Sequence, residues 1–329
     1  MQSKIPEYQS LKNKNMSKTF KRIAIVLVST LTSLTIHAQQ DPMYTHYMDN
    51  TLVINPGYAG SRDALTVTAL HRSQWVDFKG APKTQTITMH APLKNQHLGV
   101  GLSVMNDKIG PSNNTSVVGD FAYRMQLTTK SKLALGLSAG AHIFQANLSS
   151  LQLDQQSDPV FQNNIYNHVT PNLGFGAYYS RERFYAGIST PNLIQNKYSV
   201  VNQINGSTLT ATEQRHYFFI AGTVLHITDN LDFKPTTLIK VTSAAPIQAD
   251  LTASFIIMKR LLVGAMFRTG DAFGALVGFN ITDQFHIGYS YDWSYGLQTS
   301  RYNQGSHEII LRYDFLFFDK KQIHSPRYF

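Results

Sequence analysis

Apolar side chains recur at every second position over most of the chain that follows residue 62. In residues 285–293 the odd positions are aromatic or aliphatic, whereas the even positions are His286, Gly288, Ser290 and Asp292. Because residues two apart share one face of a β-strand, this stretch has one apolar face and one small or polar face. The pattern is typical of strands that separate an apolar environment from a polar one.

The alternation defines about 14 segments, most of them about nine to sixteen residues long. Strands of this length cross a bilayer when tilted, whereas strands of soluble sandwiches are shorter. No segment after residue 38 has the unbroken apolar run of roughly 18 residues that a membrane helix needs. We therefore predict an all-β fold, a transmembrane antiparallel β-barrel of about 14 strands within residues 63–318. The expected strands are 63–75, 83–92, 97–107, 115–128, 132–147, 171–181, 183–190, 213–227, 231–243, 247–257, 260–269, 271–282, 284–295 and 305–318.

The connections between these strands fall into two alternating groups. One group is short throughout, and the long polar connections 148–170, 191–212 and 296–304 all belong to the other group. Outer-membrane barrels have tight periplasmic turns and longer outer loops, so this sorting predicts that both termini lie in the periplasm. Two connections of the second group, 244–246 and Gly270, are short and weaken the pattern.

The N-terminal residues have the features of a secretory signal peptide. Lys18, Lys21 and Arg22 precede an apolar run at 23–36, and Ala38 offers a small residue for cleavage. We expect residues 1–38 to be a signal peptide with a possible upstream leader, because translation could also begin at Met16. The remaining segments are then a periplasmic N-terminal segment at 39–62, the barrel, and a periplasmic tail at 319–329.

Composition narrows the function classes. Charged residues make up 15% of the chain and aromatic residues 12%, which suits a barrel with one face in lipid. Residues 1–38 hold six of the 29 basic residues and one of the 20 acidic residues, so the remainder has a formal charge of only +4. No basic stripe with interleaved aromatic residues remains, and we expect no nucleic-acid partner. The chain has no cysteine, which excludes disulfides and thiolate metal sites.

Candidate catalytic and metal-binding residues form no recognisable site. His286 and Asp292 could act as an acid/base pair, but a mixed-charge network that fills the lumen is the simpler interpretation, because buried charges need partners. Asp154 and Asp158 could contribute to a calcium site, although such a site needs about six oxygen ligands. The twelve histidines have irregular spacing. We therefore predict no enzyme activity, no cofactor and no metal.

The segment Asn55-Pro-Gly-Tyr-Ala-Gly60 precedes the first strand and does not alternate. It could be a structural lead-in that lies under or inside the barrel, or a contact surface for a periplasmic partner. For the second interpretation the candidate partner-binding residues are Asn55, Pro56 and Tyr58, together with Arg72 and Trp75 of the first strand. Trp75 also fits an interfacial aromatic girdle.

Four motifs carry a family resemblance: Gln39-Gln-Asp-Pro-Met-Tyr-Thr-His-Tyr-Met48, Asn55-Pro-Gly-Tyr-Ala-Gly60, Arg72-Ser-Gln-Trp75 and Gly80-Ala-Pro-Lys-Thr-Gln-Thr86. They resemble the opening of the PorP/SprF family of outer-membrane proteins, which is associated with type IX secretion and gliding motility. A weaker likeness returns at Ser157-Asp-Pro-Val-Phe161. The family usually has Ala where Gly57 stands.

The resemblance implies a non-enzymatic outer-membrane component of the type IX secretion system. Such a protein supports secretion or surface anchoring of partner adhesins and links to the periplasmic machinery, so its partners are outer-membrane lipid and periplasmic and surface proteins, with no small-molecule substrate. The alternative is a passive, porin-like channel for small solutes, which requires an open lumen. A third interpretation, an outer-membrane lipase or protease, lacks a catalytic motif.

Overall fold

The computed structural model describes residues 41–151, 164–201, 208–243, 245–295 and 301–315. Three short 3₁₀ helices accompany the strands: η1 (Thr51–Val53), η2 (Pro56–Tyr58) and η3 (Leu148–Ser150). The strands are β1 (Leu65–Ser73), β2 (Lys83–Pro92), β3 (Leu98–Ile109), β4 (Ser112–Thr128), β5 (Ser131–Ala146), β6 (Ile165–Arg181), β7 (Phe184–Thr190), β8 (Lys197–Val201), β9 (Thr208–Thr212), β10 (His216–Thr223), β11 (Leu225–Thr228), β12 (Leu231–Thr242), β13 (Ala245–Ile257), β14 (Leu261–Arg268), β15 (Ala272–Asn280), β16 (Phe285–Ser294) and β17 (Ser306–Phe315).

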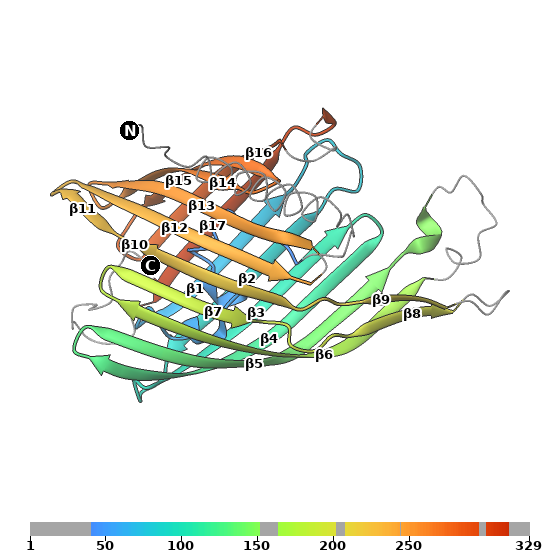
Figure 1. The fold of residues 1–329 in the computed structure, drawn as a ribbon, viewed down its shortest axis with the longest axis horizontal. Helices are drawn as coiled ribbons and strands as arrows, with labels where there is room; N and C mark the ends of the chain where they lie inside the picture. Colours follow the sequence, from blue (N-terminus) through green and yellow to red (C-terminus); the bar gives the residue numbers. More distant parts are fainter. Residues whose placement is uncertain (1–40, 152–163, 202–207, 244, 296–300, 316–329) are drawn as a thin grey trace, which may run out of the picture. The chain divides into compact units, whose positions relative to one another are not determined.

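All of these strands except β8 and β9 form one closed antiparallel barrel (Figure 1). Neighbours in the sheet are neighbours in the chain from β1 to β7 and from β12 to β17, and β1 pairs with β17. Pairing of β10 with both β7 and β12 completes the ring, with β10 and β11 as two parts of one strand. The barrel therefore has 14 strands, as predicted. Closure leaves no strand edge unpaired in lipid, where an unsatisfied backbone group is costly.

Most predicted strand boundaries agree with the structure to within a few residues. The expected strand 83–92 is β2, and the expected strand 213–227 corresponds to β10 and β11 together. The hairpin of β8 and β9 was not predicted, because it lies in the long connection 191–212 and forms a separate two-stranded sheet. β6 begins at Ile165, six residues before the predicted start. The prediction missed this part because apolar and polar side chains do not alternate regularly in residues 165–170.

Pro235 explains why one strand is divided into β10 and β11. It lies within β12, and the paired strand is interrupted at Val224. Proline has no N–H to donate to the ladder. The register is nevertheless the same on both sides of the interruption, since Gly222 faces Thr236 and Leu225 faces Phe233. The barrel wall thus continues past the proline in register, and the irregularity of this ladder lies further along, between His226 and Thr228.

The side chains alternate as the sequence predicted. In β2, Thr86, Thr88 and His90 are buried, whereas Ile87 and Met89 between them are exposed. The buried polar face lines the lumen and the exposed apolar face points away from it. Among the described residues, no helix is long and apolar enough to cross a membrane.

The two ends of the barrel differ. The start of β1 and the end of β17 lie together, as the pairing of Leu65 with Phe315 shows. That end also carries the connections β2–β3, β4–β5, β6–β7, β11–β12, β13–β14 and β15–β16, and we call it the turn end. The opposite end carries the long connections β5–β6, β7–β10 and β16–β17, and we call it the loop end.

Substitution of Leu311 tests which side chains of the last strand, β17, point toward the lipid. Its side chain is 40% exposed on the apolar face, whereas the neighbouring Arg312 is buried in the lumen. We expect Leu311→Arg to cost about 2–4 kcal/mol in the free energy of unfolding in bilayers, because it places a charge near the midplane of the lipid. Glu182→Arg, in the exposed turn between β6 and β7, is the matched control and should be neutral. If the two variants were equally stable, Leu311 would not face the lipid.

Candidate functional site inside the barrel

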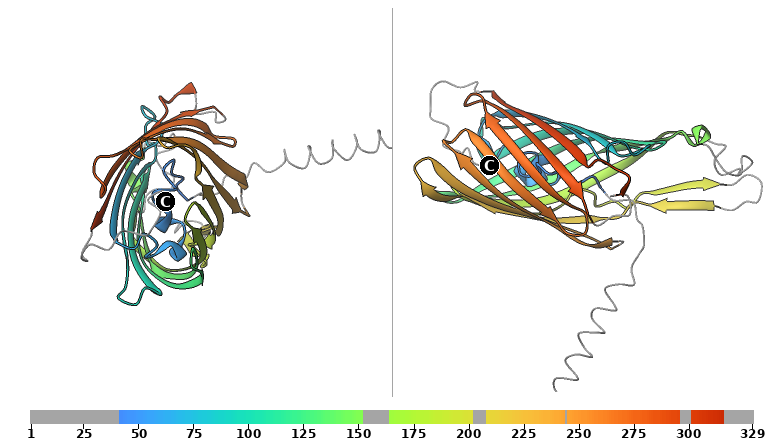
Figure 2. Two further views of the ribbon diagram at one scale, coloured as in Figure 1. Left: turned by 90° about the vertical axis from the view of Figure 1, so that its left-hand side faces the viewer. Right: turned by 90° about the horizontal axis from the view of Figure 1, so that it is seen from above.

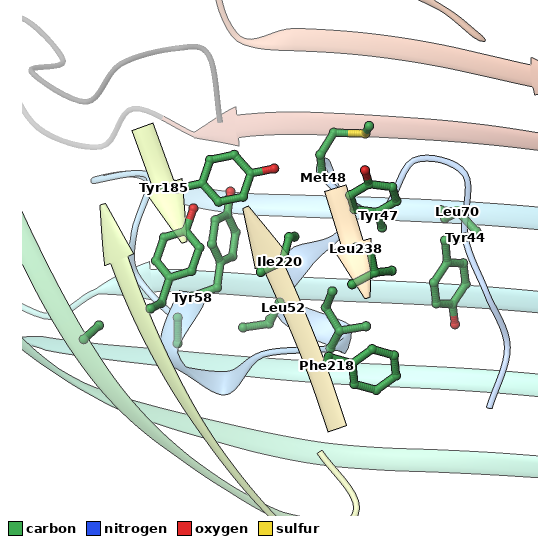
Figure 3. Close-up of a cluster of buried hydrophobic side chains, with 14 of the residues drawn as sticks. Tyr44, Tyr47, Met48, Leu52, Tyr58, Leu70, Tyr185, Phe218, Ile220 and Leu238 are labelled. Carbon is green, nitrogen blue, oxygen red and sulfur yellow. The ribbon is translucent and has the colours of Figure 1, made fainter. Parts of the chain in front are cut away.

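Residues 41–62 lie inside the barrel, and we call this segment the plug (Figure 2). Its apolar side chains form the main hydrophobic core together with inward-facing residues of the wall (Figure 3). Tyr47 is fully buried, and Leu52 and Tyr58 are 3% and 4% exposed. The core of this protein is therefore the contact between the plug and the wall. The core residues are Met43, Tyr44, Tyr47, Met48, Leu52, Ile54, Tyr58, Ala59, Leu70, Ala122, Ala134, Tyr178, Tyr185, Phe218, Ile220, Val224, Leu238 and Ile310.

The plug crosses the lumen from one end to the other. Asp41 lies at the loop end, where its carboxylate is 2.8 Å from His216 and accepts a hydrogen bond of 3.1 Å from Asn192. Gly60 lies near the turn end, where its N–H donates to His90. The next anchor, Arg62, pairs with Asp314 at 2.9 Å, close to the end of β17. The chain then enters β1 at the turn end.

Asn55 shapes the middle of the plug. Its Oδ1 accepts a 2.8 Å hydrogen bond from the Gly57 N–H and so caps η2, while Pro56 occupies the first helical position. The Nδ2 of Asn55 donates to the carbonyl oxygens of Ala177 on β6 at 3.1 Å and Ile188 on β7 at 3.4 Å. One fully buried side chain thus fixes both the local turn and its position on the wall.

A buried charge cluster holds the loop-end part of the plug. Arg72 of β1 lies 2.7 Å from Asp292 of β16 and 3.1 Å from Glu308 of β17. The two carboxylate oxygens of Glu308 accept hydrogen bonds from the backbone N–H groups of Thr45 at 3.0 Å and His46 at 2.7 Å. Because these groups are almost completely buried, each needs the others to offset the cost of desolvation.

Two further arginines of the barrel wall contact the plug at other positions along it. Arg268 of β14 is 2.7 Å from Asp250 of β13 and donates to the carbonyl of Tyr44 at 3.3 Å. Arg312 of β17 is 2.9 Å from Asp49 of the plug. Burial acts to raise the pKa of Asp49, but the hydrogen bond from His46 and the charge of Arg312 hold it well below its usual range. Asp49 is therefore ionised and available as a partner for Arg312.

Glycines on the wall make room for the plug backbone. A Cβ at Gly136 of β5 would fall within 3.0 Å of Pro56 and Gly57, and one at Gly99 of β3 would meet Ala59 equally closely. A Cβ at Gly176 of β6 would meet the side chain of Asn55. Real Cβ atoms do not approach backbone this closely, so the plug depends on glycine at these inward positions.

The sequence profile of the family described as "Type IX secretion system membrane protein PorP/SprF" matches residues 36–313. The chain belongs to this family. As a PorP/SprF protein with a β-barrel fold it is an outer-membrane protein with a role related to type IX secretion.

Solved structures of other barrels are similar to this PorP/SprF protein at low identity. Omp33 of Acinetobacter baumannii has 13% identity and a TM-score of 0.42, with 78% of this chain and 100% of that chain covered. A FadL homologue of Pseudomonas aeruginosa has 11% identity and a TM-score of 0.42, covering 77% and 89%. The CymD monoaromatic hydrocarbon channel has 10% identity and a TM-score of 0.44, covering 81% and 92%. No curated protein matches the chain.

The structure separates the five candidate partner-binding residues of this PorP/SprF protein. Asn55, Pro56 and Tyr58 are buried in the plug, and Arg72 is buried in the charge cluster. Trp75 follows β1 at the loop end, has a positive φ of 45° and is partly exposed. Its backbone N–H donates to the hydroxyl of Ser306 at 3.2 Å.

The structure does not bring His286 and Asp292 together as an acid/base pair. Asp292 binds Arg72, whereas His286 lies six residues away on β16 and is 2.8 Å from the side chain of Asn280. Both belong to the mixed-charge lining of the lumen. Within the described ranges no three His, Asp or Glu residues are placed to hold a metal ion. Asp154 and Asp158 lie outside the described residues.

Gly136→Ala tests the contact between the wall and the plug. The added methyl group overpacks against the backbone of Pro56 and Gly57, which costs about 1–3 kcal/mol. The chain has no native cysteine, so Met48→Cys provides a single buried thiol whose labelling by maleimide reports opening of the plug. We expect labelling to become roughly tenfold faster in the Gly136→Ala background.

Gly119→Ala is the matched control, because it lies on the adjacent strand β4 and its Cβ would have no neighbour nearer than 3.8 Å. Labelling should stay slow in this background. If both alanine variants label at the native rate, the plug does not depend on the space left by Gly136.

Proposed function

We propose that this protein is a non-enzymatic component of the type IX secretion system that supports secretion or surface anchoring of partner adhesins and links them to the periplasmic machinery. The observation that carries the proposal is the plug, which occupies the lumen along its length and is held by buried ion pairs. A barrel whose interior is filled in this way presents its two ends to other proteins.

The plug argues against the alternative of a passive channel. Solute passage through a barrel requires an open lumen. Here the inward arginines Arg72, Arg268 and Arg312 are bound to carboxylates and to the plug. Removing the plug would leave several of these charges without partners, at a cost of several kcal/mol.

The orientation of the barrel is part of the proposal. Tight turns are typical of the periplasmic side, so the turn end faces the periplasm and the loop end faces outward. The start of β1 and the end of β17 then lie on the periplasmic side. The signal peptide at 1–38 and the tail at 319–329 fall outside the described residues and stay predictions. A contribution to gliding motility also stays a prediction.

The five candidate residues take two roles in this proposal. Trp75, partly exposed at the loop end, contacts a surface partner. Asn55, Pro56, Tyr58 and Arg72 act indirectly, because they fix the plug and thereby the shape of the loop end around Asp41.

Conductance of the purified protein in planar bilayers separates the two functions. We expect the native protein to show little steady current, because the plug occupies the lumen. Gly136→Ala should raise the frequency of openings, whereas Gly119→Ala should not. Large and stable ohmic channels in the native protein would instead support the passive channel.

The double substitution Asn55→Ala with Tyr58→Ala tests the role of the plug in secretion. We expect the barrel to insert at normal levels, since the strand pairing is untouched, while surface display of its cognate adhesin falls several-fold. The matched control, Asn95→Ala with Tyr217→Ala, removes the same residue types at exposed positions. Loss of insertion in the double variant would make the segment purely structural. Normal display would place the partner-binding residues elsewhere.

A further inference from the structure

A second feature of the lumen is a cavity between the plug and the wall. Strands β3, β4 and β5 line one side with polar groups, among them Asp107, Asp120 and Ser138. The plug lines the other side with apolar side chains, including Leu52 and Ile54. The cavity volume is about 90 Å³, several times the roughly 10–15 Å³ that one water molecule requires.

Four carboxylates line the cavity, and two of them lack basic partners. Asp41 pairs with His216, and Glu213 pairs with His142. The described residues include seven buried carboxylates, on Asp107, Asp120, Asp232, Asp250, Asp292, Glu308 and Asp314. Five of these lie within 4.0 Å of an arginine or a histidine. The other two, Asp107 and Asp120, have no basic partner among the described residues, and both line this cavity. Asp107 accepts a hydrogen bond of 2.7 Å from Thr84.

Asp120 is the deeper of the two. It faces Ser138 directly across the β4–β5 ladder, and the two residues are 7% and 6% exposed. Within the described part of the chain, the Oδ2 of Asp120 and the hydroxyl of Ser138 have no hydrogen-bond partner. A buried carboxylate oxygen without a partner is costly, and a donor placed in the cavity would remove that cost.

We propose that Asp120 and Ser138 form a binding site for the ammonium group of a small alkyl amine. The ammonium group donates to the Oδ2 of Asp120 and to the Ser138 hydroxyl, while the methylene groups pack on Leu52 and Ile54. Asp107 lies six residues along β3 from Gly101, which is the partner of Asp120 in the ladder. That separation is about 20 Å, so an extended polyamine places further ammonium groups toward Asp107.

The chemistry of the site selects an amine over other cations and over neutral ligands. Ca²⁺ and Mg²⁺ prefer about six or more oxygen ligands, and one carboxylate with one hydroxyl supplies too few. A neutral polyol would leave the charge of Asp120 without a counter-charge and would gain little from the apolar face of the plug.

Calorimetric titration of the detergent-purified protein with spermine tests the site. We expect saturable binding that Asp120→Asn weakens at least tenfold, because a charge-assisted hydrogen bond is lost from a buried position. Ser138→Ala and Asp107→Asn should each weaken binding less. Asp229→Asn removes the same charge from a fully exposed turn and should leave binding unchanged.

Circular dichroism and thermal unfolding of each variant confirm that the barrel is intact. The proposal is overturned if native protein shows no saturable binding, or if Asp120→Asn binds spermine as tightly as native protein does. It is also overturned if Asp229→Asn weakens binding equally, since that outcome indicates attraction to overall charge. Binding of sorbitol with an affinity similar to that of spermine would show that the ligand class is wrong.

Discussion

A charge buried inside a barrel must have a partner, and most of this structure depends on how that requirement is met. Arg72 is 1% exposed, and its partners Asp292 and Glu308 are equally enclosed. Glu308 in turn accepts the backbone N–H groups of Thr45 and His46. The charges of the wall are therefore satisfied partly by each other and partly by the plug, so neither the lumen lining nor the plug is complete alone.

The hydrophobic core has an unusual position because the outer face of the barrel lies in lipid. In a soluble domain the apolar face of a sheet packs inward, but here most of that face points toward lipid. The interior core comes largely from Tyr44, Tyr47, Met48 and Leu52 of the plug. Glycines on β3, β5 and β6 then let the plug backbone approach the wall. Small residues on the wall and large residues on the plug are two parts of one packing arrangement.

Strand alternation predicted the barrel because it depends on local sequence. The pattern of Phe285 to Trp293 records which residues face lipid, whatever lies opposite them. It carries no information about what fills the lumen, and the location of residues 41–62 inside the barrel was only one of two open interpretations. The inward glycines Gly99 and Gly136 were a usable signal, since a polar lumen without a plug has no need of them. The β8–β9 hairpin was missed because it lies in a long polar connection and forms a sheet separate from that of the barrel.

The plug also sets the order in which the molecule can be built. Residues 41–62 precede every strand in the chain, yet Thr45 and His46 bind Glu308, more than 260 residues later in the chain. Glu308, Arg312 and Asp314 of the last strand all hold the plug, so these partners become available only when synthesis is almost finished. Closure of the β1–β17 seam and capture of the plug involve the same residues, and contacts of such long sequence separation form slowly. Closure of the barrel and capture of the plug are therefore coupled, and neither can be completed before the last strand is present.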